Sequence, residues 1–374
     1  MIYLDNNAST RLCDEAFEAM LPWLRDNWAN PSSIRHQPGR QARRAVEGAR
    51  ESLAETLHCR PDEIVFTSGA TEANALVMRG ARLNGQPPRR ILIARTEHVS
   101  VIAAAVQAAG QGAIAFAAPR ENGAVTADNF EALDPGPDDL ISVALVGGET
   151  GIVNDVEAVI AMARNRGAAV HVDASQAPGR TAPDLIRFRA DYATYSSHKI
   201  HGPKGTGLLM VRDGAGLEPL WTGGTQEGRR RGGTENVPAI VGFAAAAMAL
   251  TRSGHDFIAP MRALRDRFEA RLKAETGCVV IGEQAPRAAN TAMLAWPGLA
   301  NTELLAMLDR HGICASAGSA CSSATEGFAR ALRALSLPPE TVSGSVRFSL
   351  SRDTTADEIE TAADIVRTVV ADLT

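Results

Sequence analysis

Between residues 63 and 211 the chain alternates short apolar runs, rich in β-branched residues, with longer amphipathic segments. The apolar runs predict strands at 63–68, 89–94, 140–146, 168–175, 191–196 and 207–211, and the longer segments predict helices at 70–82, 99–110 and 155–167. Strands that alternate with helices usually lie parallel, because each helix returns the chain across a face of the sheet. The pattern therefore predicts an α/β fold whose mostly parallel central sheet is covered by helices on both faces.

The pattern changes after about residue 250. An amphipathic helix is predicted at 260–275, and isolated strands such as 345–351 replace the regular alternation. We therefore expect a large domain over residues 15–250 and a smaller α+β domain formed by residues 1–14 together with 251–374. The apolar stretch at 239–250 is shorter than the roughly 20 residues that cross a bilayer, so it predicts a buried helix and no membrane segment.

Composition argues against several classes of protein. The net charge is −5, and the one basic block, "GRRRGG" at 228–233, is too short to predict a nucleic-acid surface. The five cysteines are odd in number and form no C-x-x-C pair, which argues against a disulfide framework and a zinc site. The N-terminus lacks the basic region and apolar run of a signal peptide. We expect a cytoplasmic protein.

Ligands of such sheets bind beyond the carboxyl ends of the strands. At four of these ends the chain carries suggestive residues: the small residues before the 70–82 helix, His98, Asp173 and Lys199. Each has an ordinary explanation by itself: a capped helix start, a structural histidine, a paired carboxylate and a solvated lysine. The chain has neither a G-x-G-x-x-G nor a G-x-x-x-x-G-K-[ST] motif, so the usual nucleotide loops are absent.

Taken together, the four strand ends match the needs of pyridoxal 5′-phosphate (PLP). A helix N-terminus binds the phosphate, and His98 could lie over the ring. Asp173 would keep the pyridine nitrogen protonated, and Lys199 would form the Schiff base. Ser196 and His198, which flank Lys199, would add donors to the phosphate. The sequence therefore predicts a PLP site.

Nine segments, in this order and spacing, resemble the aminotransferase class V branch of the fold-type-I PLP enzymes, and more closely the cysteine desulfurases that supply sulfur for iron–sulfur cluster assembly. They are "YLDNNAST" (3–10), "NPSSIRH" (30–36), "EIVFTSGATEAN" (63–74), "TEHVSV" (96–101), "HVDASQAPG" (171–179), "SSHKIHGPKGTG" (196–207), "RRGGTENV" (230–237), "SAGSACSS" (316–323) and "SVRFSLSR" (345–352). The resemblance covers nearly the whole chain and implies the fold-type-I architecture.

The resemblance implies a role for each matching residue around the cofactor. Lys199 is similar to the Schiff-base lysine and proton shuttle, Asp173 to the partner of the pyridine nitrogen, and Gln176 to a donor to the ring hydroxyl oxygen. His98 is similar to the residue stacked on the ring. The phosphate cradle is matched by Ala70, Thr71, Ser196 and His198.

The resemblance also implies residues for the substrate and for assembly. Arg347 is similar to the clamp of the substrate carboxylate, for which a planar guanidinium is well suited. Asn30 matches an asparagine near that carboxylate. Thr234 matches a threonine that reaches the phosphate of the other subunit, which implies a homodimer.

Cys321 determines the chemistry that the resemblance implies. It lies in "SAGSACSSA", a run of small residues that could move a thiol, whereas Cys13, Cys59, Cys278 and Cys314 are expected to be small buried residues. Its thiolate would attack the sulfur of L-cysteine, leaving a persulfide on Cys321 and releasing L-alanine. Activation of the thiol would come from the fold or from His98. No resident metal is expected, although Cys321 could transiently ligate a cluster shared with a scaffold protein.

The chain departs from the family pattern at two places. Gly148 stands where the family has an asparagine that donates to the ring hydroxyl oxygen. A competing reason for glycine at this place is that the Gly147–Gly148 pair adopts a positive φ. The chain also ends before the tail with which longer members bind a scaffold. Two alternatives therefore remain: a selenocysteine lyase or another class V enzyme, and a degenerate relative that binds the cofactor with little turnover.

Overall fold

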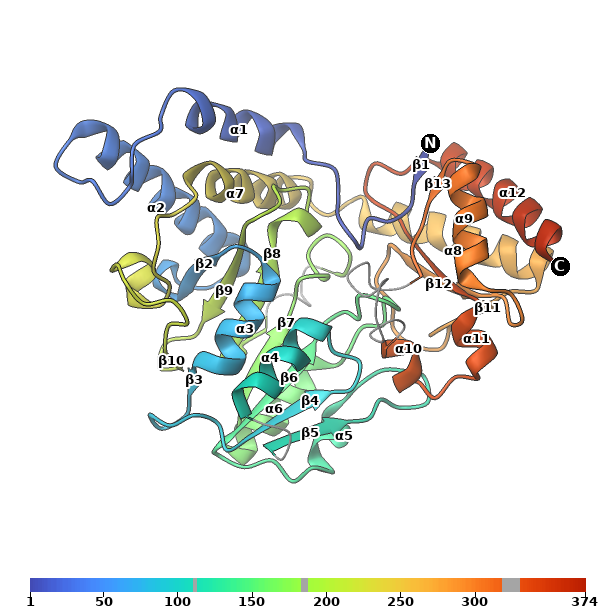
Figure 1. Cartoon of the computed structure of the whole chain (residues 1–374), viewed down its shortest axis with the longest axis horizontal. Helices are drawn as coiled ribbons and strands as arrows, with labels where there is room; N and C mark the ends of the chain where they lie inside the picture. Colours follow the sequence, from blue (N-terminus) through green and yellow to red (C-terminus); the bar gives the residue numbers. More distant parts are fainter. Residues whose placement is uncertain (110–112, 183–187, 318–329) are drawn as a thin grey trace.

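The computed structural model describes residues 1–109, 113–182, 188–317 and 330–374. Within these residues the chain forms a large α/β body and a smaller α+β body, which lie side by side in Figure 1. Each has its own hydrophobic core. The core of the smaller body combines Leu4 with residues between Ile258 and Val370, which supports the domain boundaries that we propose from the sequence, 1–14 plus 251–374.

A seven-stranded sheet forms the centre of the large body, in the order β2-β9-β8-β7-β6-β4-β5. Only β9 runs against its neighbours, β2 and β8, and the other described pairs are parallel. The mostly parallel sheet predicted from the sequence is thereby confirmed. The strands are β2 (Ile64–Thr67), β4 (Arg90–Ala94), β5 (Ile114–Ala117), β6 (Asp139–Ala144), β7 (Ala169–Asp173), β8 (Tyr192–Ser196) and β9 (Gly207–Val211).

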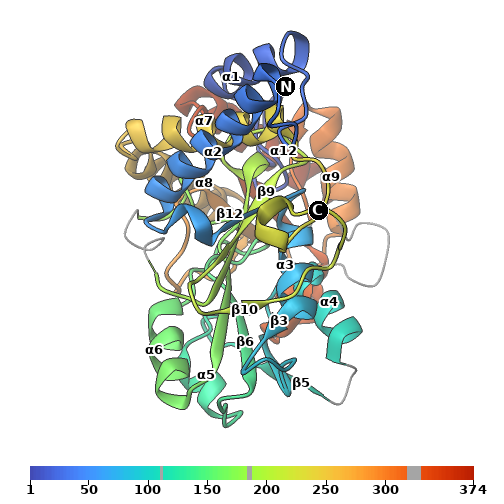
Figure 2. The ribbon, with the colours of Figure 1, turned by 90° about the vertical axis from the view of Figure 1, so that its left-hand side faces the viewer.

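Helices cover both faces of this sheet because alternate side chains of each strand point to opposite faces. Ile64 and Phe66 of β2 enter the core beneath α2, α6 and α7, whereas Val65 enters the core beneath α3 and α4. Figure 2 shows the sheet between these two layers. The helices of the large body are α1 (Asp14–Arg25), α2 (Gln37–Leu57), α3 (Ala70–Gly80), α4 (Val99–Ala109), α5 (Ala127–Glu131), α6 (Val156–Arg166) and α7 (Val237–Arg252).

The smaller body is built on the antiparallel strands β11 (Val279–Val280), β12 (Thr291–Ala295) and β14 (Ser345–Ser349). The N-terminal strand β1 (Ile2–Tyr3) pairs with β13 (Ile313–Cys314), and Asp5 bridges to Ser349, so the first residues of the chain are held against this body. Its helices are α8 (Ile258–Thr276), α9 (Asn301–Arg310), α10 (Arg330–Ala334), α11 (Pro339–Ser343) and α12 (Ala356–Leu373).

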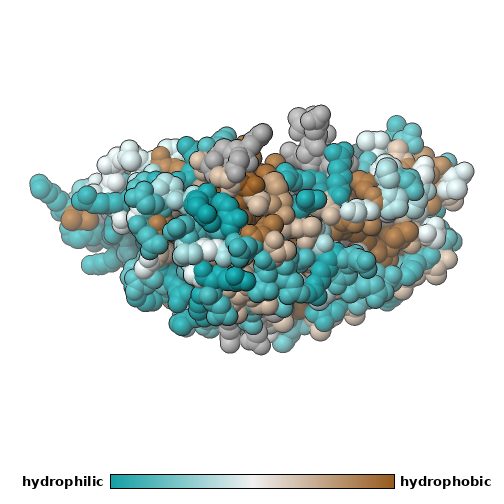
Figure 3. All heavy atoms as spheres, turned by 90° about the horizontal axis from the view of Figure 1, so that it is seen from below, coloured by the Kyte–Doolittle hydropathy of each residue, from teal (hydrophilic) through white to brown (hydrophobic). Residues whose placement is uncertain are grey.

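The elements predicted from the sequence are present, with ends that differ by a few residues. Several other elements were not singled out in the sequence analysis, among them β5, β12 and the two short strands β3 (Ala81–Arg82) and β10 (Gly216–Leu217), which pair with each other. Among the described helices, none has both the length and the apolarity to cross a membrane. Seen from below, the surface is largely hydrophilic, with smaller hydrophobic areas between the hydrophilic ones (Figure 3).

Candidate active site

A cleft of about 440 Å³ lies at the carboxyl ends of the central strands. The neighbouring strands β4 and β6 flank it, and their connections run in opposite directions along the sheet, which is where such sheets bind ligands. Arg347 of β14 reaches the same cleft from the smaller body. The predicted residues that line it are Ala70, Thr71, His98, Asp173, Gln176, Ser196, His198, Lys199 and Arg347.

Lys199 follows β8 through a single 3₁₀ turn, Ser197–Lys199. Its Nζ donates hydrogen bonds to the backbone carbonyls of Asn7 and Ala8, the latter at 2.9 Å. The N-terminal segment therefore fixes the amine inside the cleft. Lys204 also lines the cleft, but it is exposed.

One end of the cleft is formed by the start of α3, where backbone N–H groups have no partner within the helix. Gly69, which precedes this helix, has a φ of 154°, and a side chain at Gly207 would come within 2.7 Å of the Gly69 Cα atom. Glycine at both positions therefore lets the backbone of β9 come close to the start of α3. Burial and the charge of Lys199 lower the pKa of His198, beside this end, to about 4.

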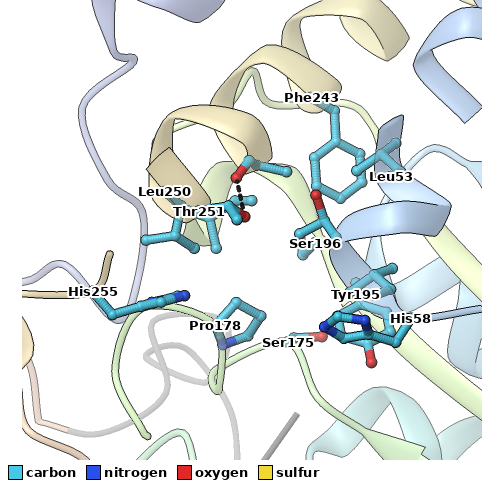
Figure 4. A pocket seen from close by; sticks show the side chains of 14 residues that line it. Leu53, His58, Ser175, Pro178, Tyr195, Ser196, Phe243, Leu250, Thr251 and His255 are labelled. Carbon is cyan, nitrogen blue, oxygen red and sulfur yellow. Dashed lines mark hydrogen bonds between the residues drawn. The ribbon is translucent and has the colours of Figure 1, made fainter. Parts of the chain in front are cut away.

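Ser196 is buried at this end of the cleft, and its Oγ has no hydrogen-bond partner among the described residues. On its other side lies a smaller cavity of about 70 Å³ with largely apolar walls. Figure 4 shows Ser196 beside Phe243 and Leu53 of that cavity. Ser196 also lines the cleft, so its hydroxyl is available to a ligand there.

Asp173 ends β7 and is almost fully buried. Its Oδ2 accepts a hydrogen bond from Asn74 Nδ2 at 2.9 Å, and its Oδ1 accepts one from the Ser175 backbone N–H at 3.0 Å. Beneath it, burial and the nearby charge of Asp173 raise the pKa of Glu97 to about 8. The raised pKa favours the protonated form of Glu97, which limits the negative charge beside Asp173.

The floor of the cleft contains a chain of buried hydrogen bonds. Ser142 Oγ donates to Glu97 Oε1 at 3.1 Å and lies 2.9 Å from His171 Nδ1. His171 Nε2 lies 3.0 Å from Thr194 Oγ1. The side chains come from the neighbouring strands β6, β7 and β8 and from the end of β4, so they tie together the strands that carry the site.

Gly148 lines the cleft next to Gln176, and its backbone carbonyl accepts hydrogen bonds from Arg347 Nη1 at 2.9 Å and Asn7 Nδ2 at 3.3 Å. Its φ lies outside the left-handed range, so the suggestion that the glycine pair serves a positive φ is wrong. A Cβ at Gly148 would lie 3.6 Å from Gln176 Nε2, an ordinary contact. Gln176 itself donates to the Asn7 carbonyl at 3.0 Å.

Arg347 forms the opposite end of the cleft. Although it is 2% exposed, its guanidinium is already engaged: Nη2 forms an ion pair with Asp5 Oδ1 at 2.8 Å, and Nη1 donates to the Gly148 carbonyl. The Nε atom is buried and has no partner among the described residues. Arg347 therefore keeps donors for a ligand at Nε, whereas a ligand at Nη2 would compete with the ion pair to Asp5.

Three predicted residues are not among those that line this cleft. Asn30 and Thr234 are exposed, and their side chains are 3.5 Å apart. Cys321 lies outside the described residues. On one side of that segment, the Ser316 backbone pairs with Arg347, and on the other side Arg330 lines the cleft.

The sequence analysis missed several residues that hold the site together: Asp5, Asn7, Asn74, Glu97 and Ser100. All five lie within segments that had been recognised for their neighbours, and Asp5 and Asn7 share "YLDNNAST". The arginines of "GRRRGG" also gain a role, because Arg231 donates to Glu72 of α3 at 2.9 Å. Polar side chains at the start of the chain and beside known motifs were the available signal.

The residues present fit PLP. The unpartnered hydroxyl of Ser196 and the N-terminus of α3 can bind a phosphate, and the buried carboxylate of Asp173 can bind a protonated ring nitrogen. Gln176 Oε1 is buried without a partner among the described residues, so this amide also has capacity for a ligand. Lys199 lies in the same cleft with its amine held in place.

Comparisons with known proteins agree with this geometry. The model of the aminotransferase class-V family matches residues 2–361. A cysteine desulfurase from Trichormus azollae is 39% identical over 372 residues, which are 99% of this chain and 93% of that protein. Among solved structures, a NifS-like protein superposes with a TM-score of 0.89 at 29% identity over 100% of both chains. SspA in complex with cysteine superposes with a TM-score of 0.80 at 28% identity over 95% of this chain and 100% of the other. The chain therefore belongs to the aminotransferase class-V family, and within that family to the cysteine desulfurases.

Proposed function

We propose that the protein is a PLP-dependent cysteine desulfurase. It converts L-cysteine to L-alanine, leaves a persulfide on Cys321 and passes that sulfur to an acceptor for iron–sulfur cluster assembly or thiolation. The observation that carries the proposal is the meeting of Lys199, Asp173 and the unpartnered hydroxyl of Ser196 in one cleft, in a chain of this family. The selenocysteine lyase, the aminotransferase and the degenerate relative are not favoured by the comparisons.

The cofactor would be held by Lys199, Asp173 and Gln176, by His98 over the ring, and at the phosphate by the cradle residues Ala70, Thr71, Ser196 and His198. Bound there, PLP supplies an electron sink for the substrate carbon. Asp173 is suited to the ring nitrogen because Asn74 and Ser175 already orient its carboxylate. Lys199 is suited to moving a proton at the substrate Cα, since the carbonyls of Asn7 and Ala8 fix its amine.

Arg347 is proposed to bind the carboxylate of L-cysteine. Its Nε is unpartnered among the described residues, and an incoming carboxylate can exchange with Asp5 at Nη2. Guanidinium groups bind carboxylates best in a two-pronged geometry. Asn30 is proposed to support the same carboxylate from the partner subunit, because in its own subunit it lies beside Thr234 and is not among the residues that line the cleft.

Sulfur transfer is proposed to use the Cys321 thiolate. The thiolate attacks the substrate sulfur, a sulfur–sulfur bond forms, and the carbon–sulfur bond breaks. The electron pair of that bond remains with the substrate carbon, which takes up a proton and becomes the methyl group of L-alanine. Both described flanks, Ser316 beside Arg347 and Arg330 in the cleft, are consistent with delivery of the thiol to this place.

We propose a homodimer in which Thr234 reaches the phosphate of the partner. Thr234 and Asn30 are exposed, and large exposed apolar side chains lie close by: Trp28 is 86% exposed, and the Trp221 carbonyl accepts from the Gly232 N–H. Exposed aromatic groups of this kind often mark interfaces. The thiol chemistry suits a reducing cytoplasm, and the acceptor is proposed to be another protein.

The test is to incubate the purified holoenzyme with L-cysteine and to assay alanine and sulfide together. Equal amounts are expected in the presence of a reductant. Borohydride treatment should fix a pyridoxyl group on the peptide containing Lys199. Label on Lys204, or no alanine, would contradict the proposal.

The second part of the test concerns the thiol. Cys321→Ala should keep the visible absorbance of the bound cofactor but form no persulfide, while Cys314→Ala, which changes a half-buried thiol of β13, serves as the matched control. Persulfide in the Cys321→Ala variant at the wild-type level would exclude Cys321 as the sulfur carrier.

A further inference from the structure

His98 is connected to Asp173 by a chain of side-chain hydrogen bonds. Asn74 Nδ2 donates to Asp173 Oδ2 at 2.9 Å and to Ser100 Oγ at 3.0 Å. Ser100 Oγ lies 2.7 Å from His98 Nδ1, and the Ser100 backbone N–H donates to the same nitrogen at 3.2 Å. Asn74 is fully buried, so the chain is shielded from water on the α3 side.

The directions of these hydrogen bonds follow from the chemistry of the groups. A carboxylate only accepts, so Asn74 must present its NH₂ group to Asp173, and the same NH₂ group also reaches Ser100. With its oxygen accepting from Asn74, Ser100 is free to donate its hydroxyl proton to His98. A backbone N–H can only donate, so both neighbours of His98 Nδ1 are donors. Nδ1 must then carry the lone pair.

We infer that Ser100 and Asn74 are positioning residues that hold His98 in the neutral tautomer with its proton on Nε2. His98 lines the cleft, and its Nδ1 is engaged away from it by Ser100, so Nε2–H is the group available to a ligand. His98 therefore acts as a hydrogen-bond and proton donor in the resting enzyme. It does not accept the proton of the Cys321 thiol at Nε2, so the activation of that thiol has to come from elsewhere.

The charges around His98 are consistent with a neutral ring. Burial lowers its pKa, the charge of Lys199 lowers it further, and Asp173 of β7 opposes both. Glu97, whose carboxylate oxygen accepts the His98 backbone N–H at 3.1 Å, is mostly protonated at neutral pH. Asp173 is thus the anion that acts on the His98 ring, and the amide of Asn74 stabilises its charge by donating a hydrogen bond.

The use of Nε2–H in catalysis rests on the proposed function, whereas the tautomer does not. A neutron crystal structure of the holoenzyme, exchanged into deuterated water at neutral pH, should show deuterium on His98 Nε2 and none on Nδ1. Deuterium on Nδ1, alone or together with Nε2, would overturn the inference. A holoenzyme that carries deuterium on Nε2 but makes no alanine would uphold the tautomer and reject the proposed function.

Two variants test the positioning role in solution. Asn74→Asp is nearly isosteric but replaces the donor to Ser100 and Asp173 with a carboxylate, so the Ser100 hydroxyl should turn toward it and Nδ1 should gain a proton. The acid limb of the kcat/KM profile for L-cysteine should move to higher pH, because Nδ1 loses the hydroxyl donor that favours the neutral ring. An acid limb unchanged from the wild type would overturn the inference.

Ser100→Ala removes the hydroxyl but keeps the backbone N–H, so it should lower kcat by roughly two- to tenfold, the range expected for one hydrogen bond, with little change in KM. Ser100→Thr restores a hydroxyl and should recover most of the rate. Ser52→Ala is the matched control, since that hydroxyl donates only to the Gly48 carbonyl on an exposed face of α2. A Ser100→Ala enzyme with unchanged kcat, or one in which KM alone rises, would argue against the positioning role.

Discussion

The two ends of the cleft present their hydrogen-bond donors in different ways. At the end formed by α3 and Ser196, which we call the phosphate end, the hydroxyl of Ser196 and the first N–H groups of the helix have no partner to lose within the described part of the chain. At the end formed by Arg347, which we call the carboxylate end, the guanidinium already bonds Asp5 and the Gly148 carbonyl.

This difference has an energetic consequence. An anion at the phosphate end gains hydrogen bonds without breaking any, and it relieves a buried hydroxyl that would otherwise stay unsatisfied. An anion at the carboxylate end competes with Asp5 for Nη2 of Arg347, so part of its binding energy is offset. The first arrangement suits a permanently bound cofactor, and the second suits a substrate that binds and leaves at each turnover.

The largest effect should follow from loss of the guanidinium. Arg347→Ala removes every donor at the carboxylate end, and hydrogen bonds to charged groups contribute about 1.5–3 kcal/mol, so KM for L-cysteine should rise roughly ten- to hundredfold. PLP affinity, measured by titration of the visible band, should change much less. Arg310→Ala on the exposed end of α9 is the control. An equal loss of PLP affinity would show that the two ends are not separate.

Asp5→Asn tests the exchange itself. The amide keeps an oxygen that can accept from Arg347 Nη2 but removes the competing charge, so KM should fall by about two- to tenfold while kcat stays near the wild-type value. A rise in KM would mean that Asp5 orients Arg347 and does not compete with the substrate. Both ends of the cleft would then be preformed for their anions, and the difference that we infer between them would be wrong.

At the phosphate end, Ser196→Ala should weaken PLP binding by about tenfold, because the hydroxyl donates to a charged group only in the loaded protein. The apo protein should be as stable as the wild type, since no protein hydrogen bond is lost. Ser142→Ala is the matched contrast. Its hydroxyl is bonded to Glu97 and His171, so the melting temperature should fall. A destabilised apo Ser196→Ala protein would mean that Ser196 has a partner in the protein.

The sequence predicted the phosphate end better than the carboxylate end, for a physical reason. Ala70, Thr71, Ser196 and Lys199 all follow strands of one sheet, and the parallel pattern itself brings such positions together. Asp5, Arg347 and Gly148 meet only because β14, the N-terminal segment and the loop after β6 come together from distant parts of the chain. Periodicity does not encode a contact of that kind, so the ion pair of Arg347 could not be foreseen.

The hydrogen-bond chains around Asp173 were also beyond the sequence analysis. Asn74 and Ser100 lie three and two residues from the predicted Thr71 and His98, yet which way each side chain points depends on how α3 packs against α4. Glu97 looked like an ordinary polar residue at a strand end, and only its burial and the nearby charge of Asp173 in the folded chain raise its pKa. The motifs therefore predicted the residues proposed to carry the chemistry, but not the neighbouring residues that form hydrogen bonds with them.

Acid should affect the phosphate end through His198. Its pKa is about 4 in the folded chain, against about 6.5 for a free histidine, so between these values the unfolded chain binds a proton that the folded chain does not. Apo stability should therefore fall as the pH drops from 6.5 toward 4. His198→Asn should make that fall smaller, by roughly 1–3 °C in melting temperature at pH 5.

His171 and His201, whose pKa values are also lowered to about 4, contribute to the same fall, so the variant should reduce it without abolishing it. Inorganic phosphate should reduce it too, since a bound anion favours the charged ring. His311→Asn on the exposed surface is the control. If His198→Asn and the wild type melt in parallel from pH 7 to pH 4, His198 does not stay neutral in the folded chain.

The smallest effect is expected at Gly148, which belongs to both ends. Its carbonyl bonds Arg347, and the missing side chain faces Gln176. Gly148→Asn has room, because its Cβ would make ordinary contacts of 3.6 Å and 3.8 Å with Gln176 and the backbone φ is not left-handed. The new amide should reach toward the ring oxygen of PLP, lower the pH midpoint of the visible band and tighten PLP binding by about two- to tenfold, since a water can recover part of that hydrogen bond in the wild type. KM for L-cysteine should stay unchanged, because the carbonyl that serves Arg347 remains.

Gly48→Asn on the exposed face of α2 controls for the general cost of replacing glycine. A normal melting temperature with an unchanged pH midpoint and PLP affinity would show that Gly148 serves only the carboxylate end, through its backbone.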